Sequence, residues 1–453
     1  MEVEAWLARA AAGQPERTAL ETPAGSRTYA QLHAAARLGA VCLRERGAGP
    51  GRRVAIALPA GLAFAEALHA CLLLGAVAVP VDLRLSAAER EQILAGAEML
   101  VDEPLGEGPA AQQSAVTAAA AATATATHDL DATAVVIHTS GTTSSPRPVA
   151  LSYANLLWSA LGSAVALGLD PRERWLCTLP VCHVGGLSIL VRSAIYGTTA
   201  IVHERFELDR VLDALEREQV TLVSLVATTL ARLLDAGLSA PPTLRCALTG
   251  GGPVPGTLVA RAAAAGVPVS LTYGLTEACS QVTTTPLAAV EAAAPGGAAA
   301  GPPLFCTRLR IAADGEILVS GPTVAPAAPA ADGWLHSGDL GALDGAGNLL
   351  VRGRKADTIV SGGENVAPAE VEAVLEAHAQ VLEAAVLGRP DAQWGEAVTA
   401  LVVVRPGATL DLEALRAHCA SALAPYKVPK HFALLAEPLP RTRSGKLLRR
   451  ELR

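Results

Sequence analysis

The chain has 453 residues, of which 51% are hydrophobic and 17% are charged, and its formal net charge at pH 7 is −7. This composition supplies a large buried core and excludes disorder for most of the length, and a chain this long favours two domains. Nothing in this acidic balance suggests a nucleic-acid groove, which would need a basic patch.

The sequence also bears on where the protein works. It begins Met-Glu-Val-Glu-Ala-Trp, which is acidic and argues against a secretory signal. The apolar stretch 54–81 is broken at Pro59, Gly75 and Pro80, so a strand, a helix and a second strand explain it better than a membrane span. The eight cysteines stand singly, which favours buried free thiols over a zinc site or disulfides. We therefore expect a cytoplasmic protein without a membrane span.

Short apolar runs alternate with longer segments rich in Ala, Leu, Glu and Arg. In chain order they predict strands at 54–58, 76–81, 134–138, 174–179, 200–203, 222–226 and 267–271, and helices at 61–74, 152–167 and 208–219. Such alternation is typical of parallel sheets covered by helices on both faces. Loops are predicted at 110–127, 291–303 and 324–332.

The pattern changes after residue 333. Strands are predicted at 349–352 and 401–404, and helices at 368–378 and 411–423. A tail of roughly 100 residues is enough for a small independent domain. Placing the boundary in the charged segment 353–357, we expect an α/β N-terminal domain over 1–353 and a small α+β C-terminal domain over 354–453.

A string of small and hydroxyl residues follows the strand predicted at 134–138. It reads Thr139-Ser140-Gly141-Thr142-Thr143-Ser144-Ser145-Pro146-Arg147. Hydroxyls and backbone amides at a strand-to-helix turn can cradle phosphate oxygens, although the spacing is not that of a Walker A loop. Taken alone, an ordinary turn explains the string at least as well.

Four further strings combine residue types that suit a nucleotide. The first places Tyr273, Gly274, Thr276 and Glu277 within five positions, which offers an aromatic for a base, a glycine for close approach, a hydroxyl for phosphate and a carboxylate for Mg²⁺. The others lie at 333–340, 353–365 and 440–446. Any one of these strings in isolation could be a strand end and a turn.

In this order and spacing the five strings closely resemble those of the adenylate-forming superfamily, which includes acyl-CoA synthetases, nonribosomal adenylation domains and luciferases. The resemblance covers nearly the whole chain. It implies an enzyme that activates a small carboxylic acid with ATP and Mg²⁺ as an acyl-adenylate and passes the acyl group to coenzyme A (CoA). It also implies that the N-terminal domain includes a small β-barrel-like part and that the C-terminal domain is mobile.

The resemblance assigns a role to single residues of the nucleotide site. It implies that β- and γ-phosphates are held by a loop made of Thr139, Ser140, Gly141, Thr142 and Thr143. The remaining implied contacts are adenine with Gly251, Gly252, Tyr273 and Gly274, the α-phosphate with Thr276, Mg²⁺ with Glu277, and ribose with Asp339 and Arg354.

The two chemical steps are assigned in the same way. Lys446 would reach the α-phosphate and the substrate carboxylate, where positive charge stabilises the transition state of attack on phosphorus. The small domain would then swing about 354–357 and present a loop with Gly362, Gly363 and Glu364 for the CoA stage. The catalytic residues that we expect are Lys446, His183, Glu277 and Thr276.

Two departures from the family pattern stand out. The phosphate loop has Ser144, Arg147 and Pro148 where the family continues Gly-x-Pro-Lys-Gly. Arginine keeps the charge of lysine but not its geometry, and the loop is stiffer without the glycines, so ATP affinity could be weakened. The hinge segment has Ala356 where the family commonly has an acidic residue or lysine.

The substrate acid is predicted from residues 179–193. In the family the histidine of this string, His183 here, lines the acyl pocket together with Gly274. Arg192 follows an apolar run, and a buried arginine needs an anion, which is either a structural glutamate or a second carboxylate on the substrate. The string is similar to that of 2-succinylbenzoate–CoA ligases of menaquinone biosynthesis, so we expect this acid.

Three alternatives stay open. The enzyme could act on another aryl or acyl acid, it could load the phosphopantetheine of a carrier protein, or its altered phosphate loop could mark a non-catalytic binding protein. The sequence does not fix the oligomeric state, and a homo-oligomer is compatible with it.

Overall fold

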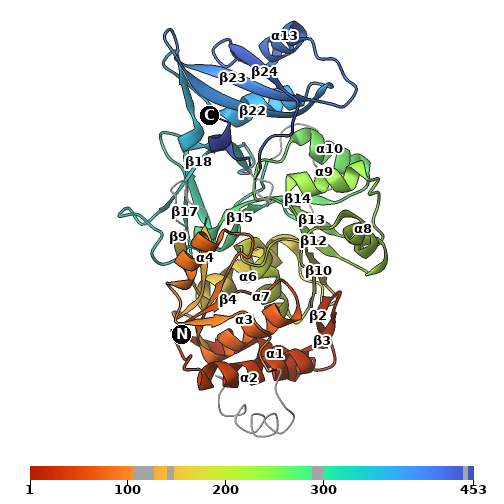
Figure 1. The fold of residues 1–453 in the computed structure, drawn as a ribbon, viewed down its shortest axis with the longest axis vertical. Helices are drawn as coiled ribbons and strands as arrows, with labels where there is room; N and C mark the ends of the chain where they lie inside the picture. Colours follow the sequence, from red (N-terminus) through yellow and green to blue (C-terminus); the bar gives the residue numbers. More distant parts are fainter. Residues whose placement is uncertain (107–126, 140–146, 288–298, 442–446, 453) are drawn as a thin grey trace.

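The computed structural model describes residues 1–106, 127–139, 147–287, 299–441 and 447–452. Figure 1 shows a large N-terminal part and a smaller C-terminal part, which lies at one end of the long axis. This is the predicted fold class. No helix within the described residues is both long and apolar enough to span a membrane.

The first sheet of the N-terminal part has the strand order β6-β4-β5-β8-β9. Its strands are β4 (Arg53–Ile56), β5 (Val77–Pro80), β6 (Met99–Val101), β8 (Thr133–Thr139) and β9 (Arg147–Ser152). All neighbours are parallel except β8 and β9. Helix α3 (Leu62–Leu74) connects β4 to β5, as predicted for 54–81, and it is apolar because 10 of its 13 residues are buried.

The second sheet has the order β15-β14-β13-β12-β10-β11-β2-β3 and is parallel except at its two edges. Its strands are β2 (Thr18–Thr22), β3 (Gly25–Thr28), β10 (Arg174–Cys177), β11 (Thr199–Val202), β12 (Leu222–Leu225), β13 (Cys246–Thr249), β14 (Val269–Leu275) and β15 (Ser280–Thr284). The strands predicted at 174–179, 200–203, 222–226 and 267–271 are confirmed. A separate pair is formed by β1 (Glu2–Glu4) and β7 (Thr127–Asp129).

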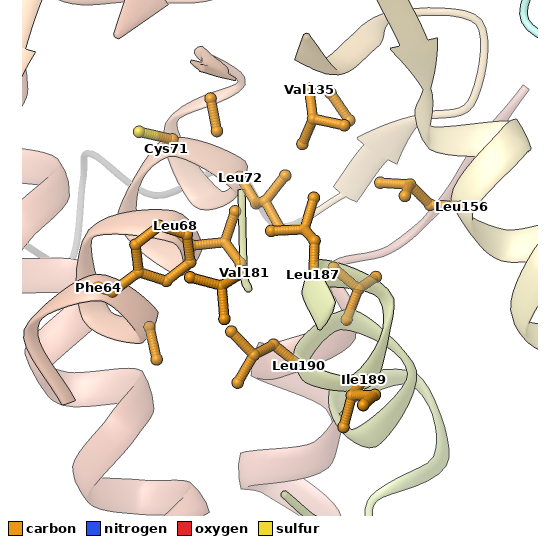
Figure 2. Packing of buried hydrophobic residues seen from close by; sticks show 14 of the residues in the cluster. Phe64, Leu68, Cys71, Leu72, Val135, Leu156, Val181, Leu187, Ile189 and Leu190 are labelled. Carbon is orange, nitrogen blue, oxygen red and sulfur yellow. The ribbon is translucent and has the colours of Figure 1, made fainter. Parts of the chain in front are cut away.

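Helices pack against both sheets, and several of them contribute to the largest core. They are α1 (Trp6–Gly13), α2 (Tyr29–Glu45), α4 (Ala87–Leu94), α6 (Tyr153–Leu167), α7 (Val184–Tyr196), α8 (Leu208–Arg217), α9 (Ala227–Asp235) and α10 (Gly256–Ala264). Figure 2 shows Phe64 and Leu68 of α3 facing Val181 and Leu187, so the segment predicted to bind the acid is embedded in this core.

An antiparallel sheet leads from the second sheet to the C-terminal part. It is formed by β16 (Arg308–Ile311), β17 (Glu316–Ser320), β18 (Leu335–Leu343) and β19 (Leu349–Arg354). The C-terminal part contains β20 (Ile359–Ser361), β21 (Glu364–Val366), β22 (Val381–Asp391), β23 (Gly395–Val404), β24 (His431–Leu435), α12 (Pro368–Glu376) and α13 (Leu412–Ala422). Both helices predicted there are confirmed, whereas the strand predicted at 401–404 is only the end of β23.

A buried ion pair at the start of β10 gives the first prediction. Glu173 is 1% exposed, and both of its carboxylate oxygens accept hydrogen bonds from Arg245 Nε, at 3.0 and 3.1 Å. Replacing Glu173 with alanine leaves Arg245 without its carboxylate, with only the backbone carbonyls of Leu167 and Gly168 as acceptors, so we expect the free energy of unfolding to fall by about 3–5 kcal/mol. Asp170→Ala removes an exposed partner of Arg172 and should cost less than about 1 kcal/mol. Urea unfolding of both variants measures the difference, and equal losses would contradict this account.

Candidate active site

Three residues that the family resemblance assigns to the nucleotide, Tyr273, Asp339 and Arg354, lie in contact. The Tyr273 hydroxyl donates to Asp339 Oδ2 at 2.8 Å, and Arg354 Nε lies 2.8 Å from Asp339 Oδ1. Tyr273 is on β14, whereas Asp339 on β18 pairs in register with Arg354 on β19. Burial and the neighbouring Asp339 raise the pKa of Tyr273, so its hydroxyl remains a donor. The cluster joins the second sheet to the antiparallel sheet.

Three glycines lie near the carboxyl ends of β13 and β14, close to Tyr273. Gly274 follows Tyr273 at a bulge, where a Cβ would lie 1.6 Å from the Ser280 carbonyl oxygen, so no larger residue fits. Gly251 and Gly252 are exposed just beyond the end of β13, the parallel neighbour of β14. Ligands of open α/β sheets bind outside the carboxyl ends of such strands.

Thr276 and Glu277 form the 3₁₀ helix η1 (Thr276–Ala278) directly after β14, and both are half-buried. The chain leaves η1 through Cys279 and Ser280, whose φ angles of 52° and 92° are rare for residues other than glycine. The Glu277 carboxylate makes no hydrogen bond or ion pair with any described residue. An unpaired, half-buried carboxylate offers only acceptor oxygens, which fit Mg²⁺.

Several predicted residues lie outside the described part of the chain: Ser140, Gly141, Thr142, Thr143 and Lys446. The residues on either side of them are described. Thr139 ends β8 and pairs with Arg147 at the start of β9, so the first segment connects two antiparallel strands. The expectation of a strand-to-helix turn was therefore wrong, because α6 begins only after β9. Arg441 and Leu447, on either side of the second segment, form an antiparallel bridge.

His183 immediately precedes α7 and is 40% exposed at its side chain. Its Nε2 lies 3.3 Å from Arg84 Nη2 and 3.9 Å from Asp82 Oδ2. Asp82 and Arg84 follow β5 and are joined through Nε–Oδ1 at 2.7 Å and Nη2–Oδ2 at 2.6 Å. Sequence reasoning missed this pair, because two charges at i and i+2 in a loop carry no signal of a site.

Arg192 lies on α7 and is only 2% exposed. Its Nη2 donates to Ser159 Oγ at 2.9 Å, and the Ser159 hydroxyl donates to the Cys279 carbonyl at 2.6 Å. No carboxylate of a described residue lies within 4.0 Å of Arg192, and its Nε has no hydrogen-bond partner there. Burial lowers the pKa of Arg192. The structural glutamate that would explain this arginine is thus not found in the described part of the chain, and Ser159 is a contact that the sequence did not reveal.

The predicted hinge is the 3₁₀ helix η2 (Lys355–Asp357), which follows β19. Lys355 Nζ contacts Asp314 Oδ2 at 2.7 Å and Glu316 Oε2 at 3.0 Å, which ties the hinge to the antiparallel sheet. On the other side, Asp357 Oδ2 lies 3.4 Å from Arg449 Nε, near the end of the chain. Ala356 lies between these two attachments.

The predicted CoA-stage loop is the turn between β20 and β21. Gly362 and Gly363 have φ angles of 61° and 85°, which a two-residue hairpin turn of this hand requires. Glu364 is the first residue of β21 and is exposed. The loop lies beyond the hinge, in the C-terminal part.

The chain is similar to known proteins along nearly its whole length. Residues 7–327 match the model of the AMP-binding enzyme family, and residues 370–446 match that of the AMP-binding enzyme C-terminal domain. The chain is 38% identical over 478 aligned positions to 2-succinylbenzoate–CoA ligase of Bacillus subtilis, covering 99% of this chain and 97% of that protein.

Two solved structures are similar along the full length. One is o-succinylbenzoate CoA synthetase from Bacillus subtilis in complex with its acyl-adenylate intermediate, with a TM-score of 0.88, 36% identity, and coverage of 100% of this chain and 98% of that one. The other is the same enzyme in complex with ATP and a magnesium ion, with a TM-score of 0.87, 36% identity and full coverage of both chains. The chain therefore belongs to the AMP-binding enzyme family.

Proposed function

We propose that this chain is an AMP-forming acid–CoA ligase that converts 2-succinylbenzoate into 2-succinylbenzoyl-CoA, a step of menaquinone biosynthesis. The observation that carries the proposal is the contact of Tyr273, Asp339 and Arg354 beside Gly274 and Glu277, in a chain similar to 2-succinylbenzoate–CoA ligases along its whole length. Because ATP and free CoA are supplied inside the cell, the proposal places the enzyme in the cytoplasm.

In the first half-reaction an oxygen of the substrate carboxylate attacks the α-phosphorus of ATP. A bond forms between that oxygen and phosphorus, the bond to the β-phosphate oxygen breaks, and pyrophosphate leaves. Asp339 would accept hydrogen bonds from the ribose hydroxyls, because an ionised carboxylate only accepts. Tyr273 and Gly274 would lie along the base, and Thr276 would contact the α-phosphate.

The charge that builds up on the phosphates needs cations. A Mg²⁺ ion held by Glu277 would neutralise phosphate charge when bound. Lys446 would reach the α-phosphate from the C-terminal part, and Thr139 to Thr143 would hold the β- and γ-phosphates. Losing one such contact commonly lowers the rate by about 10²–10³-fold.

In the second half-reaction the thiol sulfur of CoA attacks the acyl carbonyl, AMP leaves, and the thiol proton is released. We propose domains at 1–353 and 354–453, whose boundary falls between the two family matches. The contacts of Lys355 and Asp357 on either side of Ala356 make η2 a suitable pivot. Rotation there would withdraw Lys446 and bring Gly362, Gly363 and Glu364 to the pocket.

Arg192 supports the choice of acid. It is a buried cation whose Nε is unpaired and which has no carboxylate partner among the described residues, so an anion would be stabilised beside it. The second carboxylate of 2-succinylbenzoate supplies such an anion, whereas benzoate and octanoate have none. His183, at the start of the same helix, would line the acyl pocket.

The proposal is tested by measuring AMP formation from Mg·ATP that depends on both the acid and CoA. The acids compared are 2-succinylbenzoate, benzoate, octanoate and several amino acids. Strong preference for 2-succinylbenzoate supports the proposal, and preference for another acid would leave the reaction in place and overturn the substrate. Acid-dependent ATP–pyrophosphate exchange without acyl-CoA formation would instead favour a carrier-protein acceptor.

Replacing Asp339 with asparagine tests the nucleotide site. The loss of the carboxylate removes a charge-assisted acceptor for ribose and the partner of Arg354, so kcat/KM for ATP should fall by about 10–100-fold. The KM for the acid should change little, because Asp339 does not belong to the acyl pocket. Glu437→Gln removes an exposed carboxylate and serves as the control. An equal rise of both KM values in Asp339→Asn would contradict the assignment.

Replacing Arg192 with methionine keeps a long side chain and removes the charge. With 2-succinylbenzoate we expect kcat/KM to fall by about 10²-fold or more, because the second carboxylate loses its buried partner. With benzoate the change should be below about tenfold, and Arg192→Lys should recover part of the lost activity. Steady-state kinetics with both acids provides the readout. Loss of the same size for both would show that Arg192 serves the fold and not the substrate.

A further inference from the structure

The mechanism leaves one feature of the acyl pocket unused, the Asp82–Arg84 pair beside His183. Arg84 Nη2 and His183 Nε2 are 3.3 Å apart, which is within hydrogen-bond reach. The same guanidinium is fixed by Asp82 through two bonds of 2.7 and 2.6 Å, and the backbone N–H of Arg84 donates to Asp82 Oδ1 at 3.0 Å. The loop after β5 therefore presents an immobilised donor to the ring.

This contact determines which ring nitrogen carries a proton. A guanidinium only donates, so Nε2 of His183 must accept, and the neutral ring then carries its proton on Nδ1. An imidazolium would place an N–H against the N–H of Arg84. Asp82 does not bond the ring, because its oxygens are engaged by Arg84 and the nearer one lies 3.9 Å from Nε2.

The charges around the ring also favour the neutral form of His183. Burial and the positive charge of Arg84 lower the pKa of His183, and Asp82 opposes them only in part. Burial works against the ionised form of Asp82, yet the hydrogen bonds from Arg84 hold the pKa of that carboxyl below its usual range. Cys182, the preceding residue, stays neutral because burial raises its pKa to about 12.

We propose that Arg84 is a positioning residue, which holds His183 as the neutral tautomer with its proton on Nδ1, and that Asp82 keeps Arg84 in place. The inference rests on the proposed function for the role of His183 in the acyl pocket. A charged ring there would pair with a substrate carboxylate and hold it away from the α-phosphorus. The Asp82–Arg84 pair thus keeps the ring neutral, and the charge of Arg84 is balanced by Asp82.

The pH profile of Arg84→Met tests this. ATP–pyrophosphate exchange with 2-succinylbenzoate isolates the first half-reaction and is followed from about pH 5.5 to about pH 9. Without Arg84 the carboxylate of Asp82 is free to stabilise the imidazolium, so the acid limb of kcat/KM for the acid should move up by about 1 pH unit or more. Activity lost near neutral pH should return at alkaline pH.

Two further variants separate charge from packing. Arg84→Lys keeps a charged donor and should leave the acid limb close to that of the wild type. The double variant Asp82→Asn/Arg84→Met removes both charges and should bring the limb back toward the wild type. A loss in Arg84→Met that is uniform at every pH, or a double variant shifted as far as the single one, would overturn the proposal.

A measurement on the wild type does not depend on the variants folding. In spectra of protein labelled with ¹⁵N-histidine, the signal missing from His183→Gln should show a protonated Nδ1 and an unprotonated Nε2. The opposite tautomer, or a charged ring at neutral pH, would overturn the proposal. Absence of acid-dependent exchange in the wild type would count against the proposed function, whereas the tautomer would still report on Arg84.

Discussion

The contact of Asp339 with Tyr273 and Arg354 is the interaction on which the site depends. It brings together the end of β14, the middle of β18 and the last residue of β19, which belong to two different sheets. Arg354 also directly precedes η2, so this cluster of three residues and the proposed pivot are adjacent in the chain. A nucleotide bound by Asp339 would therefore lie near the segment about which the C-terminal domain is proposed to turn.

The two arginines assigned to the proposed acyl pocket, Arg192 and Arg84, differ in how their charges are balanced. Arg192 is buried without a carboxylate among the described residues, whereas Arg84 is neutralised by Asp82 beside His183. Under the proposed function Arg192 would take a substrate anion, whereas the charge of Arg84 is balanced by the protein. Such a division suits an acid with two carboxylates, of which one must be held and the other must react.

Much of the two large sheets could be predicted, because most of their central strands are short apolar runs separated by amphipathic or buried helices, as in 54–81. Their edge strands could not, since β3, β9 and β15 are rich in polar residues. Of the antiparallel sheet only β19 was predicted, at 349–352, whereas β18 could not be, since it reads Leu-His-Ser-Gly-Asp-Leu-Gly-Ala-Leu and has no continuous apolar run. That Tyr273, Gly274 and Glu277 lie close together could be predicted, because they are adjacent at one strand end. The Asp82–Arg84 pair and Ser159 could not, because only tertiary packing brings them to His183 and Arg192.

The central claim is that one pocket performs two half-reactions with different residues. Lys446 is proposed to act in the first half-reaction and to be withdrawn in the second. The measurement compares wild type and Lys446→Ala in ATP–pyrophosphate exchange with 2-succinylbenzoate and in acyl-CoA formation from the preformed acyl-adenylate and CoA. The account predicts that the exchange falls by about 10²-fold or more while thioester formation is retained. Retention of the exchange, or equal loss of both activities, would contradict it.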